Sequence, residues 1–422
     1  MIRIDLKRIC SVAVIAMLAT PALGEPVTIA VWMHEHPPRL ALDEKLVAAF
    51  EQANPDINVD LTIFPNAQFE QRLQIGFASG DGPYLFNSGS FNIGQYRHSR
   101  LLAPVDLKTV GVDDLNELKA KFGIGIAGAE FDGVAYGLPT EVSNYACVAN
   151  NALWRTAGLD PAIDAPATWE EMVEVARKLT RRDDGNVPNV RGFDFNWSDP
   201  IFMWLTFNAM VNQLGGTVID EAALTADFDS VQVRTVMDFW SAWANDWPLG
   251  GPQYTASRDA FLAGELATEC TFGSWGRDQF KAAGIDYTFF PVPRWREGTV
   301  DTGFNAYAYY MMVNANAPPE RQEAAWRFAA FYASQGEALF EEAGLFTTVP
   351  AVQELESYTS DGSNTIFTDE LDKAVFSPRV PGFNELGDAL ARARDRIVIN
   401  HEDASAALGE LEAEASTILG RF

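Results

Sequence analysis

The sequence is poor in cysteine, histidine and basic residues. It has 3 Cys and 4 His, and 31 Lys and Arg stand against 58 Asp and Glu, which gives a formal net charge of −27. So few histidines give little support to serine–histidine catalysis. The negative charge repels phosphate backbones and anionic lipid, so no nucleic-acid partner and no membrane-surface partner is expected.

Long apolar runs are also lacking after the first 24 residues. Met1–Gly24 has a basic start, an apolar run over Ile9–Ala19, and small residues Ala22 and Gly24 at the two positions that a signal peptidase reads. This pattern predicts a secretory signal peptide cleaved after Gly24. Cys10 lies inside the apolar run without a lipoprotein motif, so we expect a periplasmic protein with no lipid anchor.

Cleavage would leave 398 residues, which is too long for one ordinary core and predicts two domains. The leader has a net charge of +2, so the remainder has −29. Two cysteines remain, Cys147 and Cys270. An oxidising compartment permits one disulfide between them, and two buried free thiols are the alternative that the sequence leaves open.

The hydrophobic pattern at the start of the mature chain indicates an α/β protein. A strand is predicted over Val27–Trp32, a helix over 42–50, a strand over 57–63, and a helix that includes 73–77 and ends at the Gly-Asp-Gly-Pro turn of 80–83. The order strand–helix–strand–helix is typical of a parallel sheet covered by helices.

Later segments continue the alternation. Thr168 and Glu171 form a predicted capping box at a helix start. Residues 181–186 predict a turn, for which a calcium loop is a weak alternative because further ligands are missing. One more strand and two amphipathic helices are predicted, over 285–290, 325–332 and 386–397.

Four ordered groups of segments resemble the extracellular solute-binding proteins of bacterial ABC importers, in the maltose-binding-protein-like, sugar-binding branch. They are residues 46–55; 78–83 with Tyr96 and 101–102; 136–139 with 150–151 and 157–161; and 260–265 with 273–275. The resemblance implies a two-lobe α/β fold with a hinge and an interlobe ligand cleft. The N-terminal lobe would comprise 25–139 and 306–347, and the C-terminal lobe 140–305 and 348–422.

The resemblance also implies the function. The protein would capture a sugar or oligosaccharide and deliver it to the transmembrane subunits of an ABC permease, as a monomer without a cofactor or enzymatic activity. The chain would cross between the lobes near Pro139, near Asn305–Tyr310 and near Phe346–Val349.

A sugar needs a flat aromatic ring for its C–H face and fixed polar groups for its hydroxyls. Trp275 lies where the family places a sugar-stacking tryptophan, and Glu141 and Asp199 match acids that contact ligand. Trp32 and His34 lie at the end of the first strand, where open α/β sheets bind ligands. Further candidates are Ser88, Phe91, Trp197, Asn305, Tyr307 and Arg379.

Departures from the family pattern restrict which solutes are expected as ligands. Ser88 and Phe91 differ from the residues of the maltose binder, so maltose itself is not expected, and Ile201 replaces a tyrosine. Arg379, if it faces the cleft, would favour a sugar acid. Glycerol phosphate, a peptide or a polyamine remain alternative solutes. The acidic chain suits a cation, whereas aromatics with acids suit a neutral polyol better.

Two other site types are weaker. His34-Glu35-His36 suggests zinc, but a third converging ligand is missing; we instead expect His34, Glu35 and Arg39 to form a loop that touches ligand. Glu141 and Asp199 could pair as glycosidase carboxylates. No nucleophile elbow, phosphate loop or zincin motif is present, so an enzyme is not expected.

Overall fold

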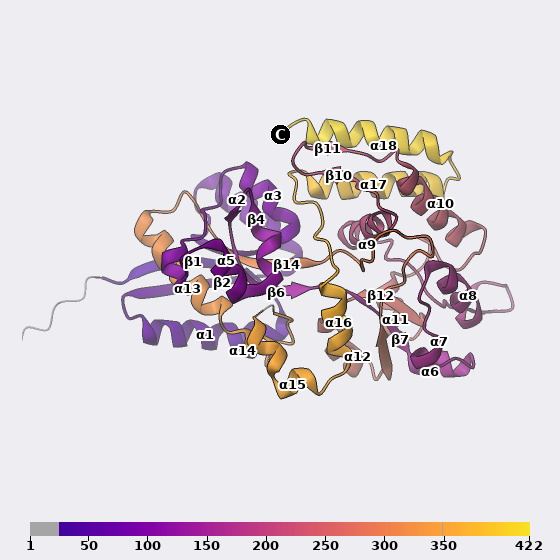
Figure 1. The fold of residues 1–422 in the computed structure, drawn as a ribbon, viewed down its shortest axis with the longest axis horizontal. Coiled ribbons are helices and arrows are strands. Elements are labelled where there is room, and N and C mark those ends of the chain that lie inside the picture. Colours follow the sequence, from indigo (N-terminus) through magenta and orange to yellow (C-terminus); the bar gives the residue numbers. More distant parts are fainter. Residues whose placement is uncertain (1–24, 348) are drawn as a thin grey trace, which may run out of the picture.

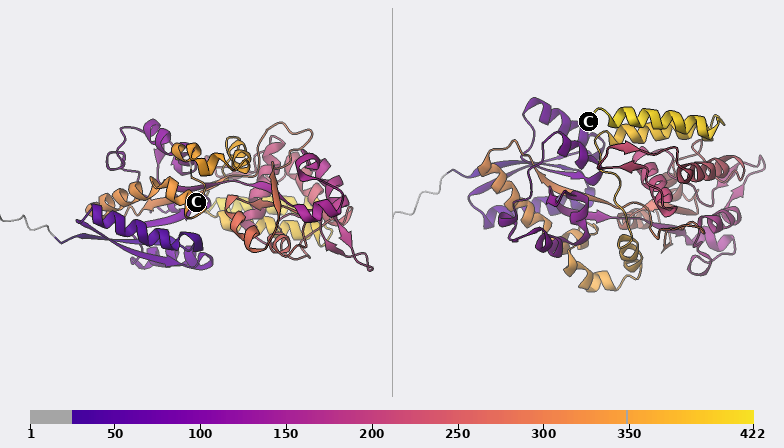
Figure 2. Two further views of the ribbon diagram at one scale, coloured as in Figure 1. Left: turned by 90° about the horizontal axis from the view of Figure 1, so that it is seen from below. Right: turned by 45° about the horizontal axis from the view of Figure 1, so that its top comes forward.

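The computed structural model describes residues 25–347 and 349–422, so the predicted leader lies outside the described residues. The described chain forms two lobes that lie side by side (Figures 1 and 2). None of the helices in this part of the chain has both the length and the apolar character needed to traverse a bilayer.

The first lobe is built on a five-stranded sheet with the order β2-β1-β3-β14-β6. β1 is parallel to β2 and β3, whereas β14 is antiparallel to both β3 and β6. β1, β2, β3 and β6 therefore run in one direction, as the prediction of a parallel sheet requires, and β14 alone is reversed. β6 carries the chain out of this lobe and β14 carries it back, so these two strands run in opposite directions. The strands are β1 (Val27–His34), β2 (Ile57–Phe64), β3 (Leu85–Gly89), β6 (Leu138–Ser143) and β14 (Tyr307–Val313).

Helices cover both faces of this sheet. Ile29, Val31 and Met33 of β1 are fully buried in the cluster that includes α1 and α13, because alternate residues of a strand face the same side. Phe86 and Leu73 belong to the cluster on the other face, with α2 and α3. The helices of this lobe are α1 (Leu40–Ala53), α2 (Asn66–Ser79), α3 (Ser90–His98), α4 (Leu107–Val110), α5 (Leu115–Phe122), α13 (Pro319–Ala333) and α14 (Gly336–Glu341).

The second lobe combines a small sheet with a helical layer. The sheet has the order β12-β7-β13, and both pairings are antiparallel. Helix α9 packs against α10 and α17, and α18 covers α17 (Figure 1). The bounds are β7 (Ala146–Asn150), β12 (Thr268–Phe272), β13 (Tyr287–Phe290), α6 (Asn151–Thr156), α7 (Pro161–Asp164), α8 (Trp169–Leu179), α9 (Pro200–Gln213), α10 (Val231–Asn245), α11 (Ser257–Leu262), α12 (Arg277–Ala282), α17 (Phe383–Val398) and α18 (Ala404–Leu419). The segment after residue 348 adds α15 (Glu356–Thr359) and α16 (Ser363–Leu371), and α16 contacts β13 and β7.

Local predictions in the second lobe are largely confirmed. Thr168 and Glu171 form the capping box of α8. The first two residues of the predicted turn 181–186 form the short strand β8 (Arg181–Arg182), and the residues after them turn into β9 (Pro188–Val190). The described residues contain no group of three or more acids, histidines or cysteines that could hold a metal, so the calcium loop has no support. Strand β13 begins at Tyr287, two residues later than predicted.

A disulfide joins two neighbouring strands of the small sheet. Cys147 of β7 is bonded to Cys270 of β12, 123 residues apart in sequence. Of the two alternatives that the sequence left open, the structure has the bridge. Because it lies within one lobe, it stiffens that lobe without restricting the hinge.

Three segments connect the lobes. β6 leads through Tyr145 into β7, and β14 brings the chain back. The third segment runs beside β6, where the Val142 amide donates to the Phe346 carbonyl at 2.9 Å. A later stretch passes the same region, because the Ala306 amide donates to the Val375 carbonyl at 2.9 Å. The hinge is therefore a group of extended segments held together by backbone hydrogen bonds.

Candidate ligand-binding cleft

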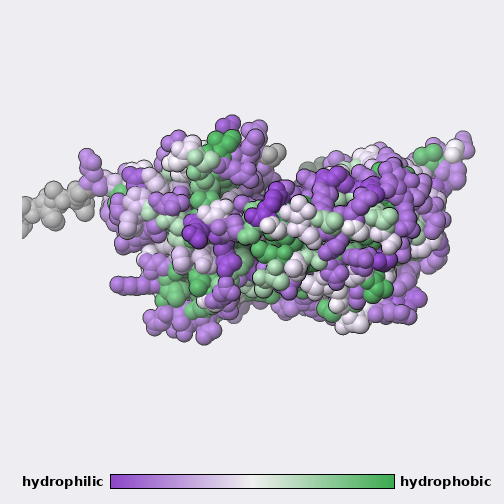
Figure 3. Space-filling view, turned by 90° about the horizontal axis from the view of Figure 1, so that it is seen from above, coloured by the Kyte–Doolittle hydropathy of each residue, from purple (hydrophilic) through white to green (hydrophobic). Residues whose placement is uncertain are grey.

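A cavity of about 740 Å³ opens between the lobes and is lined by residues from both. On the face drawn in Figure 3, polar residues predominate on both lobes, and hydrophobic residues reach the surface beside the waist between them and in patches on each lobe. The first lobe contributes His34, Glu35, Glu70, Phe91, Glu141 and Tyr309 to the lining. The second contributes Tyr145, Asp199, Phe202, Arg258, Trp275 and Asp278, and Tyr307 lies at the junction.

Glu141 is a buried carboxyl group in the cavity wall. It lies on β6 opposite Tyr309 of β14, and its side chain is only 5% exposed. The Tyr307 hydroxyl donates to its Oε1 at 3.3 Å. Burial raises the pKa of Glu141 to about 7, although the Arg39 charge and the Tyr307 hydrogen bond oppose that rise. Glu141 can therefore accept hydrogen bonds or exchange a proton near neutral pH.

Asp199 has a structural task in addition to its place in the cavity. It is the N-cap of α9, and its Oδ1 accepts the Ile201 amide at 3.0 Å and the Phe202 amide at 3.3 Å. These bonds fix the orientation of the carboxylate. Since both go to Oδ1, Oδ2 keeps its capacity to accept a hydrogen bond from a solute.

Trp275 lies on the second-lobe wall with an arginine beside it. Its indole packs edge-on against Phe272, with ring centroids 5.4 Å apart. The Arg258 guanidinium is 5.0 Å from the indole and 3.6 Å from the ring of Phe202. A Cβ on Gly273 would lie 2.6 Å from the indole Nε1, so glycine is needed for this approach. The wall thus presents a stack of flat groups.

The first-lobe wall carries its own aromatic group. His34 stacks on Tyr309 with centroids 4.3 Å apart, and Phe91 meets Tyr309 edge-on at 6.1 Å. Burial, and then the Arg39 charge, hold the pKa of His34 well below 6.5. Burial also lowers the pKa of His36, whose Nε2 lies 3.2 Å from the Ala343 carbonyl oxygen. Both histidines are therefore neutral near pH 7.

Six of the eleven predicted site residues line the cavity: His34, Phe91, Glu141, Asp199, Trp275 and Tyr307. The expectation that Arg39 touches ligand is wrong. Arg39 is fully buried, donates to the His34 carbonyl at 2.7 Å and pairs with Asp43 at 3.1 Å. It acts on the cavity only through its charge.

Trp32 and Ser88 are placed behind the cavity wall. Trp32 meets Phe64 edge-on at 5.0 Å and lies against Gly76 of α2, where a Cβ would be 2.8 Å from the indole. Ser88 has no exposed surface, and its hydroxyl donates to Glu70 at 2.6 Å. Ser88 therefore orients a lining carboxylate rather than meeting a solute.

Trp197 and Asn305 belong to the buried interior. Trp197 meets Trp240 edge-on at 5.0 Å, and its indole nitrogen donates to Asp194 at 2.6 Å. Asn305 has no exposed surface and accepts a hydrogen bond from the Asn208 side chain at 2.7 Å. Each side chain satisfies its polar atoms within the fold, so neither is available to the cavity.

Arg379 braces the lobes instead of facing the cleft. Its guanidinium donates to the carbonyls of Ala127 and Glu130, at 2.6 and 3.0 Å, on the first lobe. It also pairs with Glu221 on the second lobe at 2.8 Å. The argument for a sugar acid depended on Arg379 reaching the ligand, and this placement removes it.

Several lining residues escaped the sequence reasoning. Tyr309 had a usable signal, because it follows Tyr307 by two residues on one strand and so shares its face. Phe202 also had a signal, because it belongs to the stretch after Asp199 that resembles a ligand-lining segment of the family. Arg258, Tyr145 and Glu70 had none, since their neighbours in sequence do not distinguish them from surface or core residues. Only the packing of the two lobes brings them together.

Comparison with known proteins agrees with the presence of a cavity between two lobes. A family model described as bacterial extracellular solute-binding protein matches residues 36–338. A maltotriose-binding protein of Pyrococcus abyssi is 23% identical over 393 residues, which is 92% of this chain and 81% of that protein.

Solved structures share the fold. A Listeria monocytogenes ABC substrate-binding protein in complex with cycloalternan has a TM-score of 0.78 at 22% identity, over 94% of this chain and all of that chain. A Bdellovibrio bacteriovorus maltose/maltodextrin-binding domain bound to maltotriose has a TM-score of 0.75 at 18% identity, over 93% of this chain and 99% of that one. At these identities the likeness establishes the two-lobe architecture.

Proposed function

Because this chain belongs to the bacterial extracellular solute-binding proteins, we propose that it captures a carbohydrate in the interlobe cleft and hands it to an ABC permease. Trp275 stacks on the sugar face, and Glu141 and Asp199 accept hydrogen bonds from its hydroxyls. The solute leaves chemically unaltered, and the protein works as a secreted periplasmic monomer without a cofactor.

The cavity itself carries this proposal. An indole, three tyrosines and two phenylalanines surround the same 740 Å³ space as five carboxyl groups. Aromatic faces match the C–H face of a pyranose, and oriented carboxylates accept its hydroxyls, so the lining has both groups that carbohydrate recognition requires. The maltotriose, maltodextrin and cycloalternan named for the relatives are all oligosaccharides, which supports the same class of solute.

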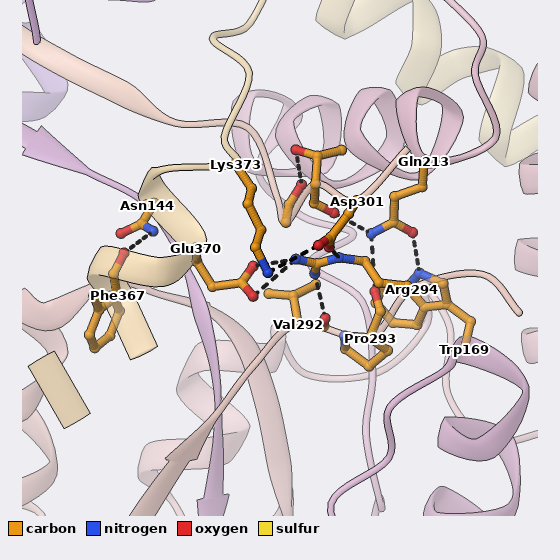
Figure 4. A network of polar contacts seen from close by, with 12 residues as sticks. Asn144, Trp169, Gln213, Val292, Pro293, Arg294, Asp301, Phe367, Glu370 and Lys373 are labelled. Carbon is orange, nitrogen blue, oxygen red and sulfur yellow. Dashed lines mark hydrogen bonds and ion pairs between the residues drawn. The ribbon is translucent and has the colours of Figure 1, made fainter. Parts of the chain in front are cut away.

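We further propose that residues 25–139 with 306–347 and residues 140–305 with 348–422 move as two bodies, with the remainder of β6, including Glu141, held to the first body by its pairing with β14. Helix α16 follows the third crossing and is tied to the second lobe by polar contacts (Figure 4). Arg294 donates to both oxygens of Glu370, at 3.0 and 3.1 Å, and to Asp301 at 2.9 Å. These bonds support assigning the segment after residue 348 to the second body, with closure as a hinge motion.

A ligand panel tests the carbohydrate proposal. The full mature chain is titrated with mono- and oligosaccharides and, separately, with peptides and glycerol phosphate, and its melting temperature is measured. A solute that binds only the folded state raises the melting temperature. We expect a carbohydrate to give the largest rise, and a rise only with non-carbohydrates would contradict the proposal.

The role of Trp275 has a matched control. Trp275→Ala should weaken binding of the carbohydrate identified in the panel about tenfold or more, since a buried stacking contact is lost. Trp247→Ala removes a partly buried indole that meets Phe239 away from the cavity, and it should leave the affinity unchanged. Equal affinities for the wild type and Trp275→Ala would remove Trp275 from the site.

The glycosidase alternative deserves its own measurement because Glu141 and Asp199 line one cavity. A raised carboxyl pKa beside a second carboxylate is also the pattern of glycoside hydrolysis. We expect stoichiometric binding with no released sugar after prolonged incubation. Release that is lost in Glu141→Gln would establish an enzyme instead.

A further inference from the structure

The charges that line the cavity are strongly unequal. Five carboxyl groups contribute to the lining, and Arg258 is the only permanently charged cation among the described lining residues. The carboxyl groups are Glu35, Glu70, Glu141, Asp199 and Asp278. His34 and His36 do not restore the balance, because their pKa values are lowered and they are neutral near pH 7.

The nearby cations are already engaged by the protein. Arg258 donates from Nε and Nη2 to the Thr271 carbonyl, and its charge also acts on the fully buried Glu269. Arg39, behind the first-lobe wall, pairs with Asp43, and both side chains are at most 1% exposed. Among the described residues neither guanidinium forms an ion pair with a carboxyl group of the cavity, and Arg39 acts on Glu141 only through its charge.

Glu141 is the carboxyl group with the least compensation. Asp199 caps α9 and lies at the positive end of that helix, and Glu70 accepts hydrogen bonds from Ser88 and Tyr96. Glu141, at 5% exposure, has the Tyr307 hydroxyl at 3.3 Å as its hydrogen-bond donor among the described residues. A buried carboxylate normally has a paired cation.

A second, independent observation lies in the same cavity. Tyr145 is 1% exposed, lines the cavity, and its hydroxyl has no hydrogen-bond partner within the described chain. The charged and phenolic groups that act on this hydroxyl are Tyr307, Arg258, Asp199 and Glu141, all of them cavity residues. A buried polar atom without a partner beside a binding cavity calls for a ligand group that completes it.

We propose that the solute is a carbohydrate bearing an ammonium group, such as an amino sugar or an oligosaccharide that contains one. This inference rests on the proposed carbohydrate function and specifies its class of solute. The ammonium donates hydrogen bonds to the Glu141 carboxylate and to the Tyr145 hydroxyl oxygen. The aromatic faces of Trp275 and Tyr309 hold the ring and favour the positive charge. A neutral sugar leaves the negative charge of the cavity uncompensated.

Matched ligands differing at one substituent test the charge. Cellobiose, the glucosamine disaccharide and its N-acetylated form share a skeleton, as do glucose, glucosamine and N-acetylglucosamine. Spermidine supplies a cation without a sugar ring. By calorimetry we expect the ammonium sugars to bind at least tenfold more tightly than their hydroxyl and acetamido counterparts, with affinity that falls as NaCl is raised.

The outcomes separate the two proposals. Tighter binding of neutral sugars, or binding of none of the ammonium sugars, overturns the amino-sugar inference while carbohydrate binding in the wider panel still upholds the proposed function. Binding of spermidine alone, with no carbohydrate bound, overturns both.

A charge-neutralising variant sharpens the assignment to Glu141. Glu141→Gln keeps the size and one acceptor oxygen, so it should weaken the binding of ammonium sugars at least tenfold more than it weakens the binding of neutral sugars. Glu354→Gln removes an exposed charge on the 3₁₀ helix Pro350–Glu354, outside the cavity, and should change neither. Melting curves verify that both variants fold. Equal losses for charged and neutral sugars in Glu141→Gln would overturn the role of the charge.

Discussion

The two walls of the cleft differ in how they hold their functional groups. On the first lobe, Glu141 and Tyr309 are carried by adjacent strands, and Glu141 is almost removed from water. On the second lobe, Asp199 stands at a helix N-terminus, and Trp275 lies on a short 3₁₀ turn. One wall buries its charge within a sheet, whereas the other displays flat groups from helix and turn ends.

This difference assigns separate tasks to the walls. A buried carboxyl group loses solvation, which raises its pKa and makes it sensitive to the charge of whatever enters. A stack of Trp275, Arg258 and Phe202 keeps its shape and offers surface. In the binding mode proposed above, the first lobe would discriminate by charge and the second would supply contact area.

Removing the disulfide should produce the largest change and should affect the second lobe alone. Cys147→Ala with Cys270→Ala frees a loop of 123 residues, and we expect a loss of roughly 4 kcal/mol in the free energy of unfolding. Calorimetry should show the second lobe melting first. Reduction of the wild type with dithiothreitol is the control. An unchanged melting curve would show that the bridge contributes nothing.

Glu141→Gln tests how much the buried charge of Glu141 lowers the free energy of unfolding. The pKa of Glu141 rises from its usual 4.5 to about 7 on folding, so the folded state binds more protons between these values. The free energy of unfolding of the wild type should therefore fall as pH rises through that window. The variant should be about 3 kcal/mol more stable than the wild type at pH 8 and nearly equal at pH 4.5. Urea denaturation at both pH values measures this, and a gap that does not grow with pH would refute it.

Gly273→Ala tests the flat surface of the second wall. The new methyl group would lie 2.6 Å from the Trp275 indole nitrogen and from the Ser143 hydroxyl, so the indole must shift. We expect about tenfold weaker solute binding, or about 1.4 kcal/mol. At Gly362 a Cβ meets no atom within 4 Å, so Gly362→Ala is the matched control and should bind normally. Normal binding by Gly273→Ala would mean that the indole position is unimportant.

Arg379→Ala should give the smallest effect, because Arg379 only helps to hold the two lobes together. Its pair with Glu221 is partly exposed, so its contribution is at most about 1 kcal/mol. The unliganded variant should be more open, with a larger radius of gyration by small-angle scattering. Arg392→Ala breaks an exposed pair within the second lobe, between α17 and α18, and should leave the radius unchanged. A compact Arg379→Ala would show that the brace does not restrain the lobes.

Several residues of the candidate site could be predicted from the sequence, because they lie on recognisable segments. Glu141 and Tyr307 lie on strands that cross between lobes, and the ordered segments around them locate those crossings. Tyr309 follows from Tyr307 by strand alternation. Trp32 shares the face of His34 in the same way, yet Gly76 of α2 lets its indole pack against that helix, so it does not reach the cavity. Periodicity identifies a face but not what covers it.

It was harder to predict from the sequence which of the other aromatic and polar residues near the cleft line the cavity. Trp197 and Asn305 have the chemistry of ligand contacts, but Asp194 and Asn208 satisfy them inside the second lobe. Arg258 had no local signal, and its position over Phe202 depends on a residue 56 positions away in the chain. Asp194 is only three residues before Trp197, whereas Asn208 and Phe202 are far in sequence from the residues that they contact, Asn305 and Arg258.

The order of hydrophobic residues alone determined the strands and helices, because burial of a strand or helix face requires a fixed spacing. The sequence likewise determined the excess of acidic residues and supplied the two cysteines that form the disulfide. Only the tertiary structure decided that Glu141 loses water while facing the cavity, that Arg39 is buried behind it, and that Arg379 spans the lobes. Burial of these groups, and the pair of Arg379 with Glu221, depend on distances between segments far apart in the sequence, which folding sets.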